Sequence, residues 1–276
     1  MKGPIGGAII ARSLVGAMAF AMGCEDKKKE VPLAPSASSL SASTLPPAAK
    51  TMKFAIDPAS TTTLEMEAPA KTDTLKGTTN AASGTLDVDF TNLANSRGEI
   101  KVDLTTLTMK TFAEKNKNES QTTHAHTWLE VGEGEDPGGK LEESVKVANR
   151  WAVYAIRSIE NASATDLTKV APTKDGADDV RKVTLTTKGE ILIHGRKVDR
   201  DADVEVQFKY DAGAAASKPK AVAIKSKKPF RITIAEHDVK PRDGLGKINK
   251  AAFHLLGTKV AENADISLDL RAKPQS

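Results

Sequence analysis

Cys24 is the residue with the clearest chemistry, because it is the only cysteine of the 276-residue chain and it closes an apolar run over residues 13–24. A short stretch carrying Lys2 and Arg12 precedes this run, and a glycine stands directly before the cysteine. A basic start, about ten apolar residues and small residues before a cut are typical of an export signal. A cysteine at the cut indicates a bacterial lipoprotein signal, in which the thiol receives a diacylglyceryl group and becomes the new N-terminus. We therefore predict a signal peptide over residues 1–23 and lipidation of Cys24.

The same segment has one alternative interpretation, a cleaved secretory signal with an incidental buried cysteine. The apolar run is too short to cross a bilayer, which takes about 20 residues. Under the lipoprotein prediction, the lipid on Cys24 is the membrane attachment of the protein, and further acyl chains are needed for firm anchoring.

Histidines are the next candidates for chemistry. His124 and His126 lie two residues apart, which puts both imidazoles on one face of a strand, as some metal sites need. On a helix the same pair diverges by about 200° and cannot share an ion. His237 is followed by Asp238, but neighbours on an extended strand point to opposite faces, so this pair is not expected to act together. We predict no metal site and no catalytic residue, and a metalloenzyme or hydrolase using these histidines is the alternative.

Other patterns of catalysis are missing from the sequence. It contains no Gly-x-Ser-x-Gly elbow and no glycine-rich phosphate loop. Most carboxylates alternate with apolar residues, which places them on a solvated face rather than in an acid–base pair. The formal net charge falls from +4 to +2 when Lys2 and Arg12 leave with the signal, and no clustered basic face is expected. The sequence therefore predicts neither an enzyme nor a nucleic-acid-binding protein.

The strands and helices that must position any site begin after residues 24–50, which we predict to be a disordered tether. Residues 24–50 are rich in Pro, Ser and Ala, have no periodicity and carry too few bulky apolar residues to pack. Residues 51–276 form the predicted folded domain, in which apolar and polar residues alternate with a period of two, as on strands with one buried and one wet face. Strands are predicted over residues 52–57, 62–67, 85–90, 99–104, 150–157, 183–193, 203–208, 230–234 and 265–271.

These strands predict an all-β fold, a lipocalin-like antiparallel barrel of about eight strands with one or two short helices. A sheet of that many strands with one apolar face must close or split into two layers, and closure removes its unpaired edges. Residues 150–157 are apolar on both faces and are predicted to be the most buried strand. Short helices are expected over residues 141–149 and 245–256, and the second is expected to be amphipathic.

The inside of such a barrel is the candidate site. A closed sheet of about eight strands either holds one small ligand or is filled by its own side chains, and both alternatives are open at this point. The inward-facing apolar residues that we predict to contact a ligand are Ile56, Leu64, Leu86, Val88, Phe90, Val102, Leu104, Val153, Leu185, Ile191, Val204, Val206, Phe230, Ile232 and Ile234.

Several segments resemble one known family. Residues 54–60 look like the opening strand of YceI-like proteins, and residues 75–90 and 98–111 resemble the strands that follow it. The clearest match, over residues 183–199, resembles the hairpin of that family. Its matching residues are Gly189, Leu192, His194, Gly195 and Lys197. The resemblance covers about residues 52–271 and implies a lipocalin-like barrel exported from the bacterial cytoplasm, in which some members carry a polyisoprenoid chain.

The chain departs from this family in two places. The first strand lacks the usual histidine, and the Arg-Asp-x-His element is replaced by residues 117–120, with His124 displaced.

Together these features predict a lipid-anchored envelope protein that binds an apolar small molecule inside a barrel. The ligand is expected to be isoprenoid- or quinone-like, with no other cofactor. The alternative is a structural or interaction lipoprotein with a packed barrel and no ligand. We expect the protein to face the periplasm from the outer membrane rather than the inner one, because glutamate and not aspartate follows Cys24.

Overall fold

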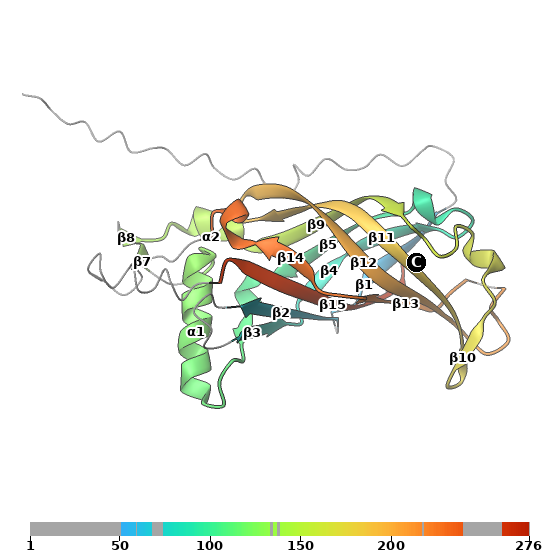
Figure 1. Cartoon of the computed structure of the whole chain (residues 1–276), viewed down its shortest axis with the longest axis horizontal. Coiled ribbons are helices and arrows are strands. Elements are labelled where there is room, and N and C mark those ends of the chain that lie inside the picture. Colours follow the sequence, from blue (N-terminus) through green and yellow to red (C-terminus); the bar gives the residue numbers. More distant parts are fainter. Residues whose placement is uncertain are drawn as a thin grey trace, which may run out of the picture. The chain divides into compact units, whose positions relative to one another are not determined.

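The alternating segments pair into one antiparallel sheet that closes on itself (Figure 1). The computed structural model describes residues 51–58, 60–67, 74–132, 135–136, 139–216, 218–239 and 261–275, with backbone alone for 61–67, 135–136 and 139–140. The described residues all belong to one compact unit. Cys24 and the predicted signal, tether and amphipathic helix over residues 245–256 lie outside these residues. None of the described helices is long and apolar enough to cross a membrane.

Eight strands form the closed ring, in the spatial order β1-β4-β5-β9-β11-β12-β13-β15, with β15 pairing back onto β1. Their bounds are β1 Thr51–Ile56, β4 Ala82–Asp89, β5 Arg97–Asp103, β9 Trp151–Glu160, β11 Asp178–Ile193, β12 Arg196–Tyr210, β13 Ala221–Ser226 and β15 Asn263–Pro274. The prediction of an all-β antiparallel barrel of about eight strands is confirmed.

The long strand β15 belongs to two parts of the barrel. Its C-terminal half pairs with β1 and β13, whereas its N-terminal half pairs with β14 (Phe230–Thr233) and β2 (Thr61–Glu67). The strands β3 (Thr74–Thr79) and β6 (Thr108–Met109) continue the sheet from β2. The remaining short strands are β10 (Thr173–Asp175), which pairs with β11, and the two-residue pair β7 (Glu135–Asp136) and β8 (Gly139–Lys140).

The two longest strands form a hairpin with a two-residue turn. Ile193 pairs with Arg196, so His194 and Gly195 make the turn, and both have positive φ, 49° and 69°. Two left-handed residues give the turn the twist that matches a β-hairpin, and glycine adopts this conformation without strain.

Two α-helices are described. The helix α1 (Lys115–Trp128) stands across one end of the barrel, opposite the end that carries β10 (Figure 1). The second, α2 (Glu143–Asn149), lies within the predicted helix over residues 141–149. The described residues also contain four 3-10 helices: η2 (Leu93–Asn95), η3 (Leu104–Thr106), η4 (Leu167–Lys169) and η5 (Ile234–His237).

The expectation that residues 150–157 form the most buried strand is wrong. In β9 only Val153 and Ile156 are buried, whereas β12 buries every second residue from Ala202 to Tyr210. The second apolar face of β9 is on the outer side of the sheet, since it alternates with the inward-facing Tyr154. There Val153 and Leu192 form a small buried cluster against the partly buried Trp151 and Ala155.

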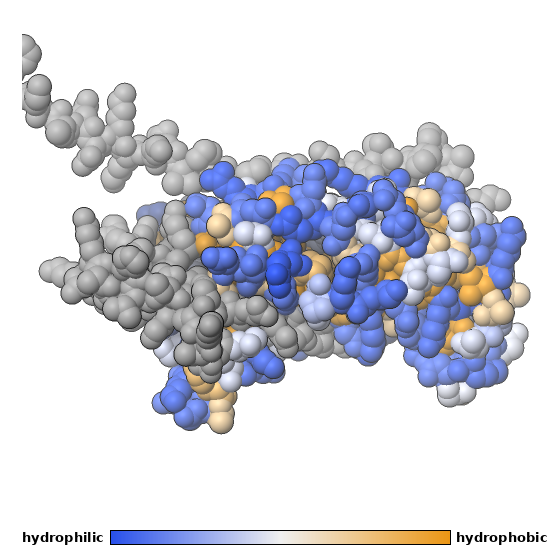
Figure 2. Space-filling view, in the orientation of Figure 1, coloured by the Kyte–Doolittle hydropathy of each residue, from blue (hydrophilic) through white to orange (hydrophobic). Residues whose placement is uncertain are grey.

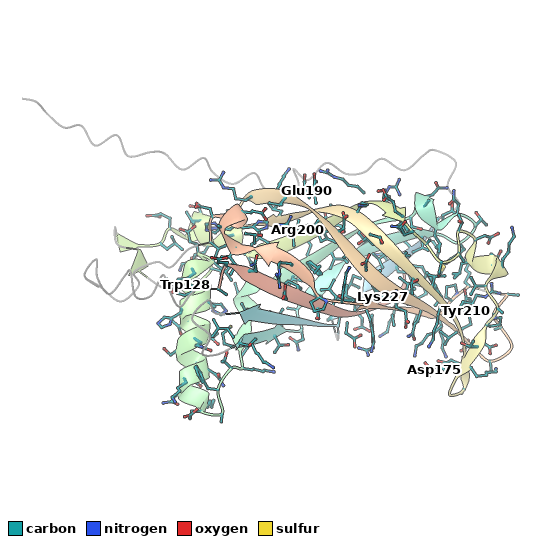
Figure 3. All side chains as sticks on the ribbon, in the orientation of Figure 1. Trp128, Asp175, Glu190, Arg200, Tyr210 and Lys227 are labelled. Atoms are coloured by element: carbon teal, nitrogen blue, oxygen red, sulfur yellow. The ribbon has the colours of Figure 1, made fainter. Side chains whose placement is uncertain are left out.

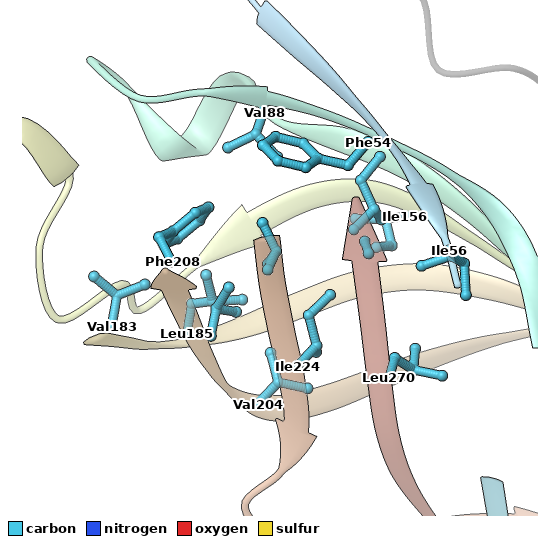
Figure 4. Close-up of a cluster of buried hydrophobic side chains, with 14 of the residues drawn as sticks. Phe54, Ile56, Val88, Ile156, Val183, Leu185, Val204, Phe208, Ile224 and Leu270 are labelled. Atoms are coloured by element: carbon cyan, nitrogen blue, oxygen red, sulfur yellow. The ribbon is translucent and has the colours of Figure 1, made fainter. Parts of the chain in front are cut away.

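One half of the barrel interior is filled by side chains. The core cluster contains Phe54, Val88, Leu185, Val204 and Phe208, which point toward one another in Figure 4. The ring of Phe90 packs edge-on against Phe54 and Phe208, with centroids 6.3 and 5.8 Å apart. The void left in this half is about 70 Å³, too small for a ligand larger than a few atoms.

The outer surface is polar where the view shows it. In Figure 2 hydrophilic residues cover most of the coloured surface, with apolar residues visible between them. This is the wet face that the alternation predicted for each strand.

Candidate ligand-binding cavity

The other half of the barrel encloses a cavity of about 450 Å³ beneath α1. This volume lies within the range of small-molecule sites, about 300–1,000 Å³. Its wall is almost wholly apolar, and the described residues that line it include no Lys, Arg, Asp or Glu. The lining residues are Leu75, Thr79, Ile100, Val102, Leu104, Leu107, Met109, Phe112, Gln121, His124, Ala125, Trp128, Leu129, Ala152, Val153, Tyr154, Ile191, Ile193, Phe230, Ile232, Ile234, His237, Val239, Ala261, Ala264, Ile266 and Leu268.

The floor of the cavity is set by Tyr154, which borders both the cavity and the small void of the packed half, together with Ile100 and Leu268. The Tyr154 hydroxyl lies 3.0 Å from the Arg200 carbonyl oxygen and 3.0 Å from Oγ1 of Thr187. Burial raises the pKa of Tyr154 to about 12, so the phenol stays neutral. The ring therefore divides a solid half from a hollow one.

A glycine makes room for that ring. A Cβ on Gly189 would lie 2.6 Å from the Tyr154 ring and 2.5 Å from the Ala155 carbonyl oxygen, which no side chain tolerates. The register between β9 and β11 also shifts at this point, between Lys188 and Gly189. The close approach of the Tyr154 ring thus explains why a glycine is needed at position 189, one of the positions that match the family hairpin.

The helix α1 closes one side of the cavity although its sequence is polar and it buries no residue fully. Gln121, His124, Ala125 and Trp128 line the cavity from this helix, and Figure 3 labels Trp128 at the helix-covered end, away from Tyr210.

Four hydrogen bonds attach α1 to the barrel wall. The Thr122 hydroxyl oxygen accepts from the Met109 N–H at 2.9 Å, and Asn118 bonds both backbone groups of Phe112. His126 Nε2 lies 2.9 Å from the Leu107 carbonyl oxygen, and burial lowers the pKa of this histidine. The helix is therefore fixed by polar contacts, and its cavity-facing side chains have defined positions.

A buried polar corner lies where α1 ends. His194 Nε2 is 2.6 Å from Oε2 of Glu130, and Asn149 donates to the same oxygen at 3.0 Å. The other ring nitrogen, Nδ1 of His194, donates to the His237 carbonyl oxygen at 3.1 Å. Glu130, His194 and Asp238 all have left-handed backbones, with φ of 55°, 49° and 55°. These contacts join the end of α1, α2, the β11–β12 turn and η5, and so fix the segment that carries His237.

His237 is the most buried polar side chain of the cavity, with 1% of its surface exposed. Its Nδ1 donates to the Arg196 carbonyl oxygen at 3.2 Å, because a carbonyl oxygen can only accept. Burial lowers the pKa of His237, and the carbonyls of Arg196 and Ile193 oppose that shift only in part. The ring is therefore neutral near pH 7.

The predicted contact residues divide between the two halves. Those that line the cavity are Val102, Leu104, Val153, Ile191, Phe230, Ile232 and Ile234, although the Val153 side chain also belongs to the outer cluster with Leu192. Those in the packed half are Ile56, Leu86, Val88, Phe90, Leu185, Val204 and Val206. Leu64 lies on β2, where the structure describes the backbone alone.

The three histidines that the sequence offered for chemistry do not form one site: His124 and His126 lie on α1 and His237 on η5. His124 and His126 lie on α1, so the helical alternative applies, in which the two rings diverge. His124 faces the cavity, whereas His126 bonds the wall. Among the described residues, no three His, Cys, Asp or Glu side chains are placed to hold a metal ion.

Sequence reasoning missed the contribution of α1 and of the segment before it. Leu107, Met109 and Phe112 line the cavity, as do Trp128 and Leu129. Periodicity did not find them because α1 is not amphipathic and because the segment from Leu104 to Phe112 contains a short 3-10 helix and a two-residue strand, too short for a visible period. The presence of Trp128 in a chain with two tryptophans was the available signal.

The fold and the cavity define the class of this protein: an all-β, lipocalin-like antiparallel barrel with an apolar internal site under a helix. No family model matches the chain, and no curated protein matches it either.

Several solved structures are similar to the chain, among them the following two. A polyisoprenoid binding domain from Saccharophagus degradans, implicated in plant cell wall breakdown, has 11% identity and a TM-score of 0.48, covering 81% of this chain and 99% of that one. BcnA from Burkholderia cenocepacia has 13% identity and a TM-score of 0.43, covering 79% of this chain and 99% of that one. Neither similarity is close enough to assign a ligand to this chain.

Proposed function

We propose that this protein binds one apolar, isoprenoid-like small molecule in the cavity under α1. The observation that carries the proposal is the cavity itself, about 450 Å³ of space with an almost wholly apolar wall in a barrel whose other half is packed solid. An empty apolar space of this size leaves its wall atoms without contacts on one side, which is costly to maintain unless something occupies it.

The cavity wall favours a hydrocarbon chain with methyl branches. Side chains of Ile, Leu and Val supply most of the wall, and each buried methylene of a ligand contributes about 0.8 kcal/mol before the costs of ordering. The described lining residues offer no charged group to activate a substrate, so the proposed role is binding rather than catalysis.

The lipid anchor is a separate part of the proposal and is supported by the sequence alone. We place the protein in the bacterial cell envelope, facing the periplasm and attached through Cys24, with the outer membrane preferred over the inner one. Membrane fractionation tests this part: Cys24→Ser should move the protein to the soluble fraction, and an unchanged distribution would contradict lipidation.

Native mass spectrometry tests the binding function. The full chain isolated from its own cells should carry a bound apolar molecule, which organic extraction and mass analysis would identify. A ligand-free mass, together with failure of an uncharged apolar dye such as N-phenyl-1-naphthylamine to bind, would contradict it. That result would favour the alternative, a structural or interaction lipoprotein without a ligand.

A further inference from the structure

The cavity ends at a partition made of three side chains. Ile100, Tyr154 and Leu268 border both the cavity of about 450 Å³ and the void of about 70 Å³ in the packed half. They come from β5, β9 and β15, and β15 pairs with neither of the other two strands. Beyond them the interior is filled by the core cluster that contains Phe54 and Phe208. A ligand in the cavity therefore meets these three side chains at its inner end.

Tyr154 is the largest side chain of this partition, and hydrogen bonds hold it in place. Its hydroxyl oxygen lies 3.0 Å from the Arg200 carbonyl oxygen, 3.0 Å from Oγ1 of Thr187 and 3.2 Å from the Thr187 carbonyl oxygen. The ring also requires Gly189, which lies inside β11, where a glycine weakens a strand. The longest strand of the barrel thus contains a residue of low strand propensity that makes room for this ring.

The ring of Tyr154 faces the cavity, and its hydroxyl group does not. Although the side chain lies inside the barrel, it is not fully buried, as expected where one side borders free space. The hydroxyl group bonds Thr187, which lines the small void and not the cavity. The polar end of the side chain is therefore on the far side of the partition, and a hydrocarbon ligand contacts the apolar ring.

From this arrangement we propose that Tyr154 sets the maximum length of the ligand. This inference rests on the proposed binding function and adds a specificity-determining residue to it. A straight hydrocarbon chain gains contacts with each added carbon until its end reaches the ring. A longer chain must fold back or leave its outer end outside the cavity, because the packed half beyond the ring cannot yield without losing close contacts.

The test is a displacement assay with the purified full chain loaded with N-phenyl-1-naphthylamine. The competitors are straight-chain 1-alkanols from octanol to hexadecanol, in steps of two carbons. Each step should tighten binding about fifteen-fold while the added carbons are buried. The improvement should stop at the length at which the alcohol reaches Tyr154. An affinity that rises at one rate through the whole series would overturn the proposal.

Variants at position 154 assign this break in affinity to the ring. Tyr154→Ala joins the cavity to the void beyond it, so the break should move to longer alcohols. The first alcohol past the wild-type break should then bind about fifteen-fold more tightly than it binds the wild type. Tyr154→Phe is the matched control, because it keeps the ring and removes the hydroxyl group, and its break should stay in place. Limited solubility of the longer alcohols would give the same break in every variant.

A second control lies beyond the partition. Ile224 lines the small void and not the cavity, so Ile224→Ala enlarges the void while the ring stays in place, and the break should not move. A break that moves in this variant as well would show that looser packing, and not the ring, determines the length limit.

The outcomes distinguish this inference from the binding function. Failure of the dye to bind the wild-type protein contradicts the binding function itself. Dye binding with a break that stays at the same alcohol in Tyr154→Ala overturns the role of Tyr154 alone. Tyr154→Leu takes the place of Tyr154→Ala if circular dichroism shows that the alanine variant does not fold, since leucine keeps apolar contacts and is still shorter than the ring.

Discussion

A matched pair of isoleucines tests the division of the barrel into a solid and a hollow half. Ile224 lies in the packed half and is 8% exposed, whereas Ile232 lines the cavity and is 6% exposed. Both are strand residues of one apolar type with nearly equal exposure. Substituting each by alanine therefore removes the same three carbon atoms from a buried position. The two positions differ in whether packed side chains or the cavity surround the removed atoms.

The magnitudes follow from the packing. Losing three carbon atoms costs about 2.4 kcal/mol of transfer free energy at either site, at about 0.8 kcal/mol per methylene. At Ile224 the removed volume adds to a void of just about 70 Å³ between packed side chains, which raises the cost to about 4 kcal/mol. At Ile232 the removed volume joins a cavity of about 450 Å³ that is already present, so fewer contacts are lost. We expect Ile232→Ala to cost about 2.5 kcal/mol.

Urea unfolding of the ligand-free protein, followed by tryptophan fluorescence, measures both losses in free energy of unfolding. The double variant serves as a control, because sites in separate halves should give additive losses to within about 0.5 kcal/mol. Equal losses for the two single variants, or a larger one for Ile232→Ala, would show that the space under α1 is filled like the rest of the core.

Three further predictions concern the cavity and the buried histidines. Ala264→Phe should place a ring in the cavity and weaken dye binding about ten-fold or more with the circular dichroism spectrum kept, and unchanged dye affinity would contradict the position of the site. In Trp151→Phe, Trp128 is the remaining tryptophan and lines the cavity, so an apolar ligand should shift its emission; a shift that survives in Trp128→Phe instead would place the ligand elsewhere. Burial lowers the pKa of His126 and His237 below the ordinary histidine value of about 6.5, so the unfolded chain binds more protons in mild acid. The free energy of unfolding should therefore fall as the pH drops below about 6.5, and a flat profile between about pH 7.5 and 5.5 would refute this assignment.

Alternation predicted most of the barrel because its physical cause is local. A strand such as residues 203–208 needs apolar residues on one face and polar ones on the other, and this pattern is visible without knowledge of its neighbours. The strand β13 was missed because Ala221 to Ile224 are apolar on both parities, which gives no clear period of two. The helix α1 is absent from the predicted elements, since a polar helix has no apolar stripe to reveal it.

The boundary between the two halves of the interior could not be predicted in this way. Val204 and Ile232 follow the same alternation, yet the first is in the solid half and the second faces open space. The two positions differ because the Tyr154 ring packs on Gly189 between them and because α1 covers one end of the barrel. Both features depend on contacts between distant parts of the chain.

The double use of β15 has a consequence for the order of assembly. This strand follows all the other described strands in the chain, and it pairs with β1, β2, β13 and β14. One of the contacts that seal the ring joins Ser60 to Arg271, 211 positions later. A chain that ends before Asn263 therefore has no closed ring, and it also lacks Ala264 and Ile266, which line the cavity. Ring closure and completion of the cavity wall thus depend on the pairing of the same strand, β15.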